Sequence, residues 1–254
     1  MVLNALRESI LGAVEYWRSP ELGNRWGGPF NGQQVRAALF QSLIAKIHAR
    51  AIVETGTYRG ATTEFMAQTG LPIFTIESHA RSYGFARARL FRHRNVFVRR
   101  GDSRIVLRQL FRGPLRKFTD QTVFWYLDAH WNDELPLAEE IDLVFNHYPA
   151  AAVMIDDFQV PFDADYAYDN YGADKALTSA YVEAALRTHT LQAFYPSVPA
   201  SNETGMRRGC VVLAKRTFHA GVLEGMAELR SFDWSTDDVH PAYRSTVRMR
   251  GKRM

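Results

Sequence analysis

The sequence predicts an α/β protein with a Rossmann-like, doubly wound sheet of seven strands and helices on both faces. From residue 51 onward, short apolar runs alternate with longer segments of helical periodicity, which is typical of βαβ units with parallel strands. The last two apolar runs are instead separated by a polar loop without helical periodicity, residues 196–209. This favours an antiparallel pair. We therefore expect a mostly parallel sheet that ends in a C-terminal antiparallel hairpin.

The individual elements follow from local periodicity. Strands are expected at the short apolar runs, which are residues 51–54, 73–76, 96–99, 122–127, 151–155, 191–195 and 210–214. Helices are expected in the intervals, near residues 61–69, 81–93, 103–112, 135–147 and 173–188. Two further helices precede the sheet, because apolar residues recur at helical spacing from Leu3 to Trp17 and again from Val35 to Ile47.

The 254 residues are expected to form one domain with three parts. Residues 1–50 form an N-terminal helical extension or lid, residues 51–218 the Rossmann-like core, and residues 219–254 a C-terminal helix and a basic tail. Hydrophobic residues make up 46% and charged residues 23%, which is the balance of a globular chain rather than a disordered one. The single cysteine, Cys210, has no partner for an internal disulfide and lies in an expected strand.

Hydropathy and charge argue against membrane and nucleic-acid functions. No apolar run approaches the ~20 residues that span a bilayer, so we expect a cytoplasmic protein without a membrane partner. Basic residues concentrate at 81–117 and 244–253, but the net charge is only +4. We interpret both clusters as solvated surface, and a nucleic-acid partner is disfavoured. The N-terminal helices are compatible with a homodimer as well as with a lid.

Residues 54–60, which read Glu-Thr-Gly-Thr-Tyr-Arg-Gly, join the first expected strand to a helix. Ligands of open α/β sheets bind beyond the carboxyl ends of the strands, where glycines let the backbone turn and approach the ligand. The helix that follows supplies free backbone N–H groups. The second strand is followed by Glu77, whose carboxylate suits the two hydroxyls of an adenosine ribose. Together these features indicate a nucleoside-bearing cofactor, which is either S-adenosylmethionine or NAD.

Two details favour S-adenosylmethionine. A dinucleotide fingerprint has the spacing G-x-G-x-x-G, whereas Gly56 and Gly60 are separated by three residues, two of them bulky. Glu54 would repel a pyrophosphate but suits the ammonium group of a methionine. Asp102 and Ser103 follow the third strand, where either one meets an adenine edge or, alternatively, caps the next helix. An NAD-dependent oxidoreductase is the alternative enzyme.

Three carboxylates follow the fourth and fifth expected strands, at Asp128, Asp156 and Asp157. All-oxygen ligands favour Mg²⁺, Ca²⁺ or Mn²⁺ over zinc. Three like charges gathered without a cation are unfavourable, which argues for a bound metal or for raised pKa values. The sequence therefore predicts a divalent-metal site at these positions. In the alternative interpretation, Asp156 or Asp157 only caps a turn.

These motifs resemble those of the metal-dependent O-methyltransferases of the catechol and caffeoyl-CoA type, the macrocin-type sugar O-methyltransferases and the cephalosporin-hydroxylase-like group. The similarity covers about residues 51–158. It implies a class I S-adenosylmethionine-dependent methyltransferase in which Asp128, Asp156 and Asp157 hold a Mg²⁺ that chelates the acceptor oxygen. The cofactor-binding residues implied by the resemblance are Glu54, Gly56, Thr57, Tyr58, Gly60, Thr62, Glu77, Ser78, Asp102, Ser103 and Asp128.

The general base departs from the family pattern. Catechol-type enzymes place a lysine shortly after the first metal aspartate, whereas residues 129–133 here read Ala-His-Trp-Asn-Asp. His130 is the candidate base, because an unperturbed histidine pKa near ~6.5 suits proton abstraction at neutral pH. Alternatively, His130 only hydrogen-bonds the metal aspartates. The expected reaction is a direct displacement, in which an acceptor hydroxyl attacks the sulfonium methyl group beside Asp128 and His130.

Two loops are candidates for the acceptor side of the pocket. Residues 163–174 carry Tyr166, Tyr168 and Tyr171, which suit stacking on a ring, together with four acids. Residues 26–33 place glycines beside aromatics and are a candidate lid. Each loop is alternatively a surface turn without a role in binding.

The expected acceptor is a hydroxyl of a small molecule, such as a sugar, a natural product or a phenol. A nucleic-acid methyltransferase is a further alternative, but the sequence has no Asn/Asp-Pro-Pro-aromatic motif and no Pro-Cys nucleophile. The last alternative is a protein that binds the cofactor without turnover.

Overall fold

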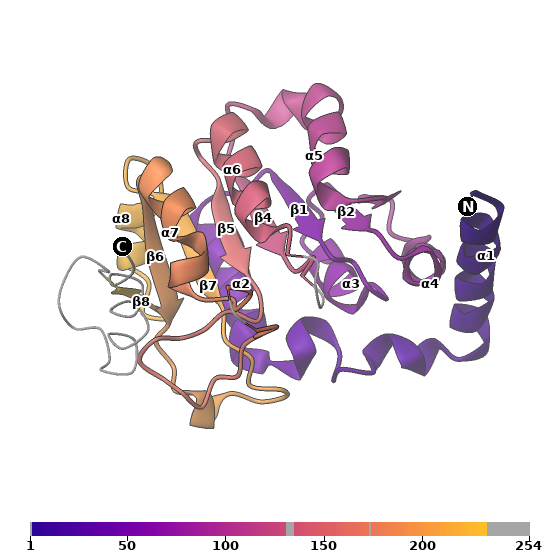
Figure 1. Ribbon diagram of the computed structural model, residues 1–254, viewed down its shortest axis with the longest axis horizontal. Helices are drawn as coiled ribbons and strands as arrows, with labels where there is room; N and C mark the ends of the chain where they lie inside the picture. Colours follow the sequence, from indigo (N-terminus) through magenta and orange to yellow (C-terminus); the bar gives the residue numbers. More distant parts are fainter. Residues whose placement is uncertain (1, 131–134, 173, 233–254) are drawn as a thin grey trace, which may run out of the picture.

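The computed structural model describes residues 2–130, 135–172 and 174–232, which contain one eight-stranded sheet (Figure 1). The strand order is β3-β2-β1-β4-β5-β7-β6-β8. The strands are β1 (Ala51–Thr55), β2 (Ile73–Glu77), β3 (Val96–Arg100), β4 (Val123–Leu127), β5 (Ala152–Ile155), β6 (Leu191–Pro196), β7 (Val211–Lys215) and β8 (Leu229–Phe232). Strands β1 to β5 are parallel, whereas β7 pairs antiparallel with β5 and β6. The expected α/β sheet with a C-terminal antiparallel hairpin is confirmed.

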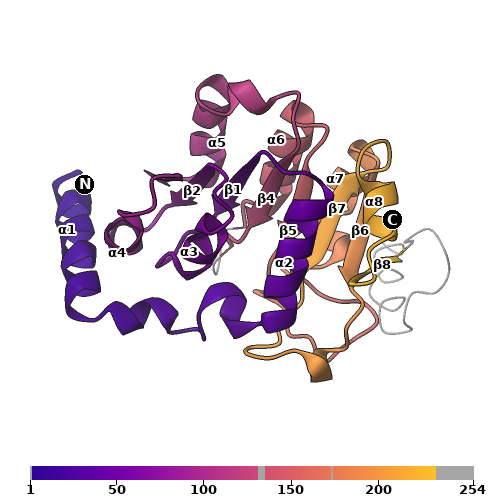
Figure 2. The same ribbon diagram turned by 180° about the vertical axis from the view of Figure 1, so that it is seen from behind.

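Helices cover both faces of the sheet (Figures 1 and 2). They are α1 (Val2–Arg18), α2 (Gln34–Lys46), α3 (Ala61–Ala67), α4 (Ala80–Leu90), α5 (Ser103–Arg112), α6 (Leu137–His147), α7 (Ser179–Thr188) and α8 (Ala220–Glu224), with short 3-10 turns η1 (Pro20–Asn24), η2 (Pro29–Gly32), η3 (Arg116–Phe118) and η4 (Ala200–Asn202). Alternate strand residues point to opposite faces. Val53 and Trp125 therefore join a core with α5, α6 and α7, whereas Ile52 and Phe124 join a second core with α2, α3 and α8.

The register of the parallel strands gathers their carboxyl ends at one edge of the sheet. Thr55 at the end of β1 lies beside Ile76 of β2 and Leu127 of β4, and Leu127 lies beside Ile155 of β5. Every residue of β1 and β4 is buried, because both strands have neighbours on each side and helices on each face. The segments that follow these strands are therefore held close together on a rigid base.

The N-terminal helix α1 lies at the far edge of the molecule, against α4 (Figures 1 and 2). The two helices approach closely at glycines. A Cβ at Gly12 would lie 1.9 Å from the carbonyl oxygen of Arg81, and a Cβ at Gly84 would lie 1.8 Å from that of Ser9. No larger residue fits at either glycine without moving the helices apart.

Strand β8 departs from the seven-stranded expectation. It pairs antiparallel with β6 over Ala193 to Pro196 and becomes the edge of the sheet. Phe232 packs its ring 6.3 Å from that of Tyr195. The four residues of β8 read Leu-Arg-Ser-Phe, which is too short an alternation to predict a strand.

The helix expected at residues 173–188 begins later, at Ser179. The preceding residues form a bridge between Asn170 and Ala176, and the Lys175 amide donates to the Gly172 carbonyl. These hydrogen bonds hold the backbone before Ser179 in a turn, so the helix cannot begin earlier. Ala173, residues 131–133 and the basic cluster at 244–253 lie outside the described residues. Within the described part of the chain, no helix has the length and apolar character needed to cross a membrane.

Candidate active site

A pocket of about 1010 Å³ opens beyond the carboxyl ends of the parallel strands. Ligand sites of open α/β sheets are expected at this edge. Every predicted cofactor residue except Gly60 lines the pocket; these residues are Glu54, Gly56, Thr57, Tyr58, Thr62, Glu77, Ser78, Asp102, Ser103 and Asp128. The structure therefore brings residues from four separate strand ends into one cavity.

The glycine turn after β1 needs glycine at its start. Gly56 has φ +84°, and a Cβ there would lie 2.0 Å from the carbonyl oxygen of Asp128. The backbones that follow β1 and β4 are therefore in contact, which no side chain at position 56 would permit. Gly60 also has a positive φ, +78°, and it occupies the N-cap of α3, where a Cβ would meet Leu90. Gly60 therefore shapes the turn from outside the pocket.

Glu77 holds this turn in place. Its Oε2 accepts a hydrogen bond from the Tyr58 amide at 2.6 Å, and its Oε1 accepts one from the His79 amide at 2.7 Å. Tyr58 has φ +48°, a conformation that the Glu77 hydrogen bond helps to hold. Burial raises the pKa of Glu77 to about 7. The carboxylate thus lines the pocket and also fixes the backbone beside it.

Glu54 is buried beneath the same turn, with 1% of its surface exposed. Its Oε2 accepts hydrogen bonds from the hydroxyls of Thr63 and Thr75, both at 2.5 Å. Burial raises the pKa of Glu54 to about 7, although the two hydroxyls oppose the shift. A cationic ligand group beside Glu54 would favour the ionised carboxylate.

Asp102 caps α5, as the alternative interpretation of this motif expects. Its Oδ1 accepts from the Arg104 amide at 2.9 Å, and its carboxylate is paired with the Arg104 guanidinium. The hydrogen bond from Arg104 lowers the pKa of Asp102. Ser103 is buried and hydrogen-bonds Glu140 of α6. Both Asp102 and Ser103 still line the pocket, so their contact with an adenine stays a prediction.

Glu140 gives the apoprotein a specific pH dependence. Burial raises its pKa from 4.5 to about 7. Because the folded pKa is the higher one, this carboxyl stabilises the fold fully below about pH 4.5 and loses that contribution as the pH rises through about 7. Between about pH 5 and pH 8, wild type should lose on the order of 2 kcal/mol more unfolding free energy than Glu140→Gln. Urea denaturation at the two pH values measures the difference, and equal losses in both proteins would contradict it.

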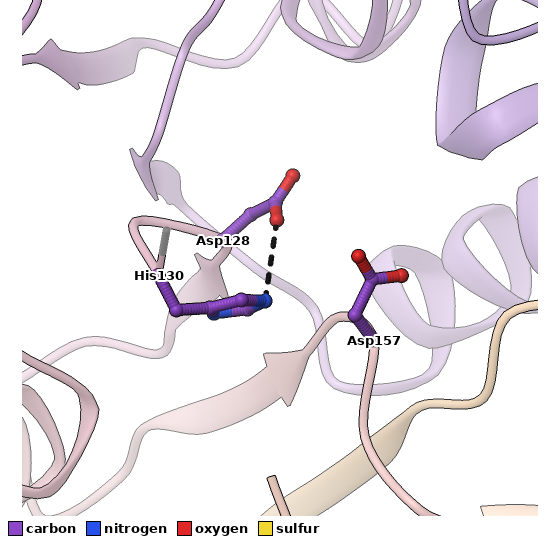
Figure 3. A group of neighbouring side chains, drawn as sticks. All are labelled: Asp128, His130 and Asp157. Carbon is purple, nitrogen blue, oxygen red and sulfur yellow. Dashed lines mark ion pairs between the residues drawn. The ribbon is translucent and has the colours of Figure 1, made fainter. Parts of the chain in front are cut away.

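A second group of side chains follows β4 and β5 and faces the same pocket. Asp128, His130 and Asp157 each offer a ligand atom, and these atoms lie within 4.8 Å of one another (Figure 3). His130 Nε2 lies 3.6 Å from Asp128 Oδ1. That nitrogen is buried and has no hydrogen-bond partner among the described residues. Two carboxylates and an otherwise unpartnered imidazole nitrogen are a donor set that fits a divalent cation.

Asp128 and His130 both have shifted pKa values in the protein without a metal. Withdrawal from bulk water raises the pKa of Asp128 well above its usual range, and the carboxylates of Asp157 and Glu54 raise it further. Burial lowers the pKa of His130, so its imidazole is neutral at neutral pH. A neutral imidazole can bind a metal or accept a proton.

Asp156 does not join this group, although its position after β5 predicted a metal ligand. It is 1% exposed, and its carboxylate forms an ion pair with the buried guanidinium of Arg36 on α2. Tyr126 Oη donates to Asp156 Oδ2 at 2.6 Å, and Asn31 Nδ2 donates to the same oxygen at 3.3 Å. Strand β5 has ended at Ile155, and Asp157 has a left-handed backbone with φ +51°; Asp156 enters the protein interior, whereas Asp157 faces the pocket.

Two pocket residues carry no sequence motif of their own. Arg208 Nε donates to Asp157 Oδ1 at 2.8 Å, and the Arg208 guanidinium also pairs with Asp169. Asp169 Oδ2 lies 3.8 Å from His130 Nε2. Asp169 belongs to the acidic loop that the sequence marked, but nothing in the sequence indicated that it faces His130. Arg208 lies in a polar loop whose pattern carries no functional signal.

Each of the two candidate loops has some residues that line the pocket and others that are buried in the protein. In residues 26–33, Trp26, Gly28 and Asn31 line the pocket, whereas Phe30 is fully buried among aromatic side chains of the core. In residues 163–174, Asp169 lines the pocket. Tyr166 is buried and donates to the Val198 carbonyl, so it is not available to stack on a ligand.

No protein-family model matches this sequence, and no curated protein matches it. Solved structures do resemble it. An O-methyltransferase from Bacillus cereus in complex with S-adenosylhomocysteine (SAH) is 19% identical, with a TM-score of 0.51 over 72% of this chain and 81% of that chain. A protein from Klebsiella pneumoniae assigned to the O-methyltransferases is 19% identical, with a TM-score of 0.53 over 78% of this chain and 88% of that chain.

The methyltransferase domain of a bacterial CtHen1 protein is 12% identical, with a TM-score of 0.50 over 72% of this chain and 97% of that chain. The chain has the fold of the class I methyltransferases. Within this methyltransferase fold, the pocket and the glycine turn lie together beyond β1 and β2.

Proposed function

We propose that the protein is an S-adenosylmethionine-dependent O-methyltransferase that acts on a hydroxyl group of a small molecule. The observation that carries this proposal is the set of side chains that line the pocket beyond the strand ends. The glycine turn, Glu54 near the end of β1 and Glu77 at the end of β2 line it, and so do Asp128, His130 and Asp157. A cofactor and an acceptor that share this cavity would be held side by side for a direct methyl transfer.

The cofactor half of the site follows from the chemistry of each side chain. Glu77 would accept the ribose hydroxyls, while its hydrogen bonds from the Tyr58 and His79 amides keep the glycine turn fixed. Glu54 suits the amino group of the methionine moiety, because a cation there relieves the strain of a buried carboxylate. Asp102 and Ser103, after β3, would meet the adenine edge. This assignment explains why acids rather than a pyrophosphate-binding turn line the pocket.

The acceptor half is assigned to Asp128, His130 and Asp157, which would hold a divalent cation. The sequence favoured Mg²⁺ from an all-oxygen set; the imidazole in the observed group makes Mn²⁺ an equally good fit. Such an ion would supply a Lewis acid that lowers the pKa of an acceptor hydroxyl. The protein's own contribution is orientation: Arg208 fixes Asp157, and the neutral imidazole of His130 binds the ion or takes the acceptor proton.

Calorimetric titration with SAH and with NAD⁺ tests the choice of cofactor. We expect SAH to bind with a dissociation constant on the order of 10 μM and NAD⁺ to give no heat of binding. The rival oxidoreductase makes the opposite prediction. Binding of NAD⁺ without binding of SAH would overturn the proposed function, and binding of neither would support a role outside nucleoside cofactors.

Gly56→Ala should weaken SAH binding by at least about tenfold. The added methyl would stand 2.0 Å from the Asp128 carbonyl oxygen, so the turn or the β4 end must move. Gly70→Ala is the matched control. Gly70 also has a positive φ, +72°, but nothing lies within 4 Å of its added methyl. The control carries the same backbone strain without the collision, and circular dichroism would verify that both variants fold. Equal SAH affinity in the two would contradict the assigned turn.

A further inference from the structure

Helix α1 exposes five large apolar side chains, which we call the α1 stripe. They are Leu3 (83% exposed), Leu6 (57%), Ile10 (57%), Val14 (39%) and Trp17 (64%). Their spacing of three and four residues places them along one face of the helix. A surface helix of a globular protein normally turns its apolar face toward the core. The α1 stripe instead lies largely in solvent, and its Trp17 end contacts an apolar side chain outside α1, that of Phe91.

The opposite face of α1 packs against α4. Gly12 of α1 and Gly84 of α4 bring the two backbones into contact, and Glu15 Oε2 accepts from Arg81 Nε at 2.6 Å. These contacts fix the rotation of the helix. Because α1 stands at the edge of the molecule with α4 on one side only, rolling the stripe inward would break the glycine contacts (Figures 1 and 2).

The α1 stripe is symmetric about Ile10. Leu3 and Trp17 lie seven residues on either side of it, and Leu6 and Val14 lie four residues on either side. If a copy of α1 packs antiparallel about a two-fold axis at Ile10, the axis relates position 3 to position 17 and position 6 to position 14. Every stripe residue then meets another stripe residue, which is the self-complementarity that a two-fold interface requires.

We propose that α1 is the interface of a homodimer, in which two α1 stripes pack antiparallel with Ile10 on the two-fold axis. Phe91, after α4, enlarges the apolar surface at one end. It is 58% exposed, and its ring lies 5.7 Å from that of Trp17. Leu3 of the partner subunit packs against this aromatic pair. The proposal does not depend on the proposed enzymatic function.

The exposed area is sufficient for a stable dimer. The α1 stripe and Phe91 expose on the order of 700 Å² of side-chain surface per copy. Each partner of a standard interface contributes about 800 Å², and the largest apolar patch of a typical monomer is about 300–600 Å². A lipid surface also fits an apolar helix face, but it gives no reason for symmetry about one residue. The second copy is therefore the occupant that the pattern favours.

The interface has a consequence for the pocket. Glu15, on the inner side of α1, accepts from Arg59 Nη2 at 2.6 Å, and both residues line the pocket beside the glycine turn. Fixing α1 between α4 and a second subunit holds Glu15 in place and thereby supports Arg59.

Sedimentation equilibrium of the full chain tests the proposal. We expect a wild-type dimer, and we expect Ile10→Asp to raise the dimer dissociation constant at least about 100-fold, because two carboxylates would then face each other at the centre of the interface. Ile105→Asp is the matched control, since Ile105 is a helical isoleucine with a similar exposure of 59%. Ile10 is exposed in the monomer, so both variants should fold and keep the wild-type circular dichroism spectrum.

Cysteine crosslinking tests the register. Ile10→Cys should form an intersubunit disulfide on mild oxidation, because the two-fold axis places that position against itself. Leu6→Cys should not, because the two positions 6 would be offset by about 12 Å along antiparallel helices. The native Cys210 is buried and does not interfere.

Three results would overturn the proposal. One is a wild-type monomer at all concentrations tested, including a monomer whose α1 instead binds anionic lipid vesicles. The second is a dimer that Ile10→Asp leaves intact. The third is a disulfide that forms as readily at position 6 as at position 10, which would exclude the antiparallel register.

Discussion

Asp156→Asn should lower the free energy of unfolding by about 3–5 kcal/mol and leave divalent-metal affinity near that of wild type. The substitution keeps the shape of the side chain but removes the only carboxylate paired, among the described residues, with the buried Arg36 guanidinium. A buried cation without its partner is strongly destabilising. Urea denaturation measures the loss, and titration with Mn²⁺ followed by electron paramagnetic resonance measures metal binding.

The double variant Arg36→Met/Asp156→Leu is the control for this prediction. It removes both charges and replaces them with apolar side chains of similar length, so it should recover most of the stability that the single variant loses. If Asp156→Asn instead lost metal binding with little loss of stability, Asp156 would be a ligand and the assignment of the two neighbouring aspartates would be reversed.

Asp128→Asn should show the opposite pattern. We expect Mn²⁺ affinity to fall at least about 100-fold. A residue that only hydrogen-bonds a metal ligand typically costs about 10–100-fold when it is replaced, so a larger loss indicates a direct ligand. Stability of the apoprotein should stay equal or rise slightly, because the substitution removes one of several nearby negative charges. Methyl transfer to any acceptor should be lost along with the metal. The same denaturation and resonance measurements apply.

Asp165→Asn is the matched control for the metal prediction. Asp165 is an exposed acid in the loop that follows β5, outside the pocket lining, so its substitution should change neither stability nor Mn²⁺ affinity. Retention of full Mn²⁺ affinity in Asp128→Asn would remove Asp128 from the metal site.

The central strands β1, β4 and β5 were predictable because they are buried on both faces and therefore appear as continuous apolar runs. Strands β1 and β4 begin and end within about two residues of the expected positions, since the apolar runs stop where the backbone leaves the core. Strand β8 has one apolar residue at each end, and it forms because it pairs with β6. This pairing cannot be predicted from the local sequence. The start of α7 depends on a turn closed by Asn170 and Ala176 in the same way.

The limits of prediction at the site are clearest at Asp156 and Asp157. The two are identical in residue type and adjacent in sequence, yet one pairs with Arg36 on a distant helix and the other faces the pocket. The local sequence predicted that both carboxylates bind a metal, because it gave no information about the buried partner of Asp156, Arg36. Arg208 and Asp169 reach the site from distant loops, so only the tertiary structure identifies them. The pocket position of the residues proposed for the cofactor was easier to predict, because it depends on strand ends alone.

A crystal structure of the protein grown with SAH and Mn²⁺ tests the two-part site most directly. We predict SAH in the pocket with its ribose at Glu77, and an anomalous Mn²⁺ peak between Asp128, His130 and Asp157, next to the SAH sulfur. SAH bound without such a peak would leave the cofactor assignment in place and contradict the metal centre. SAH bound elsewhere, or not at all, would contradict the assignment of this pocket to methyl transfer.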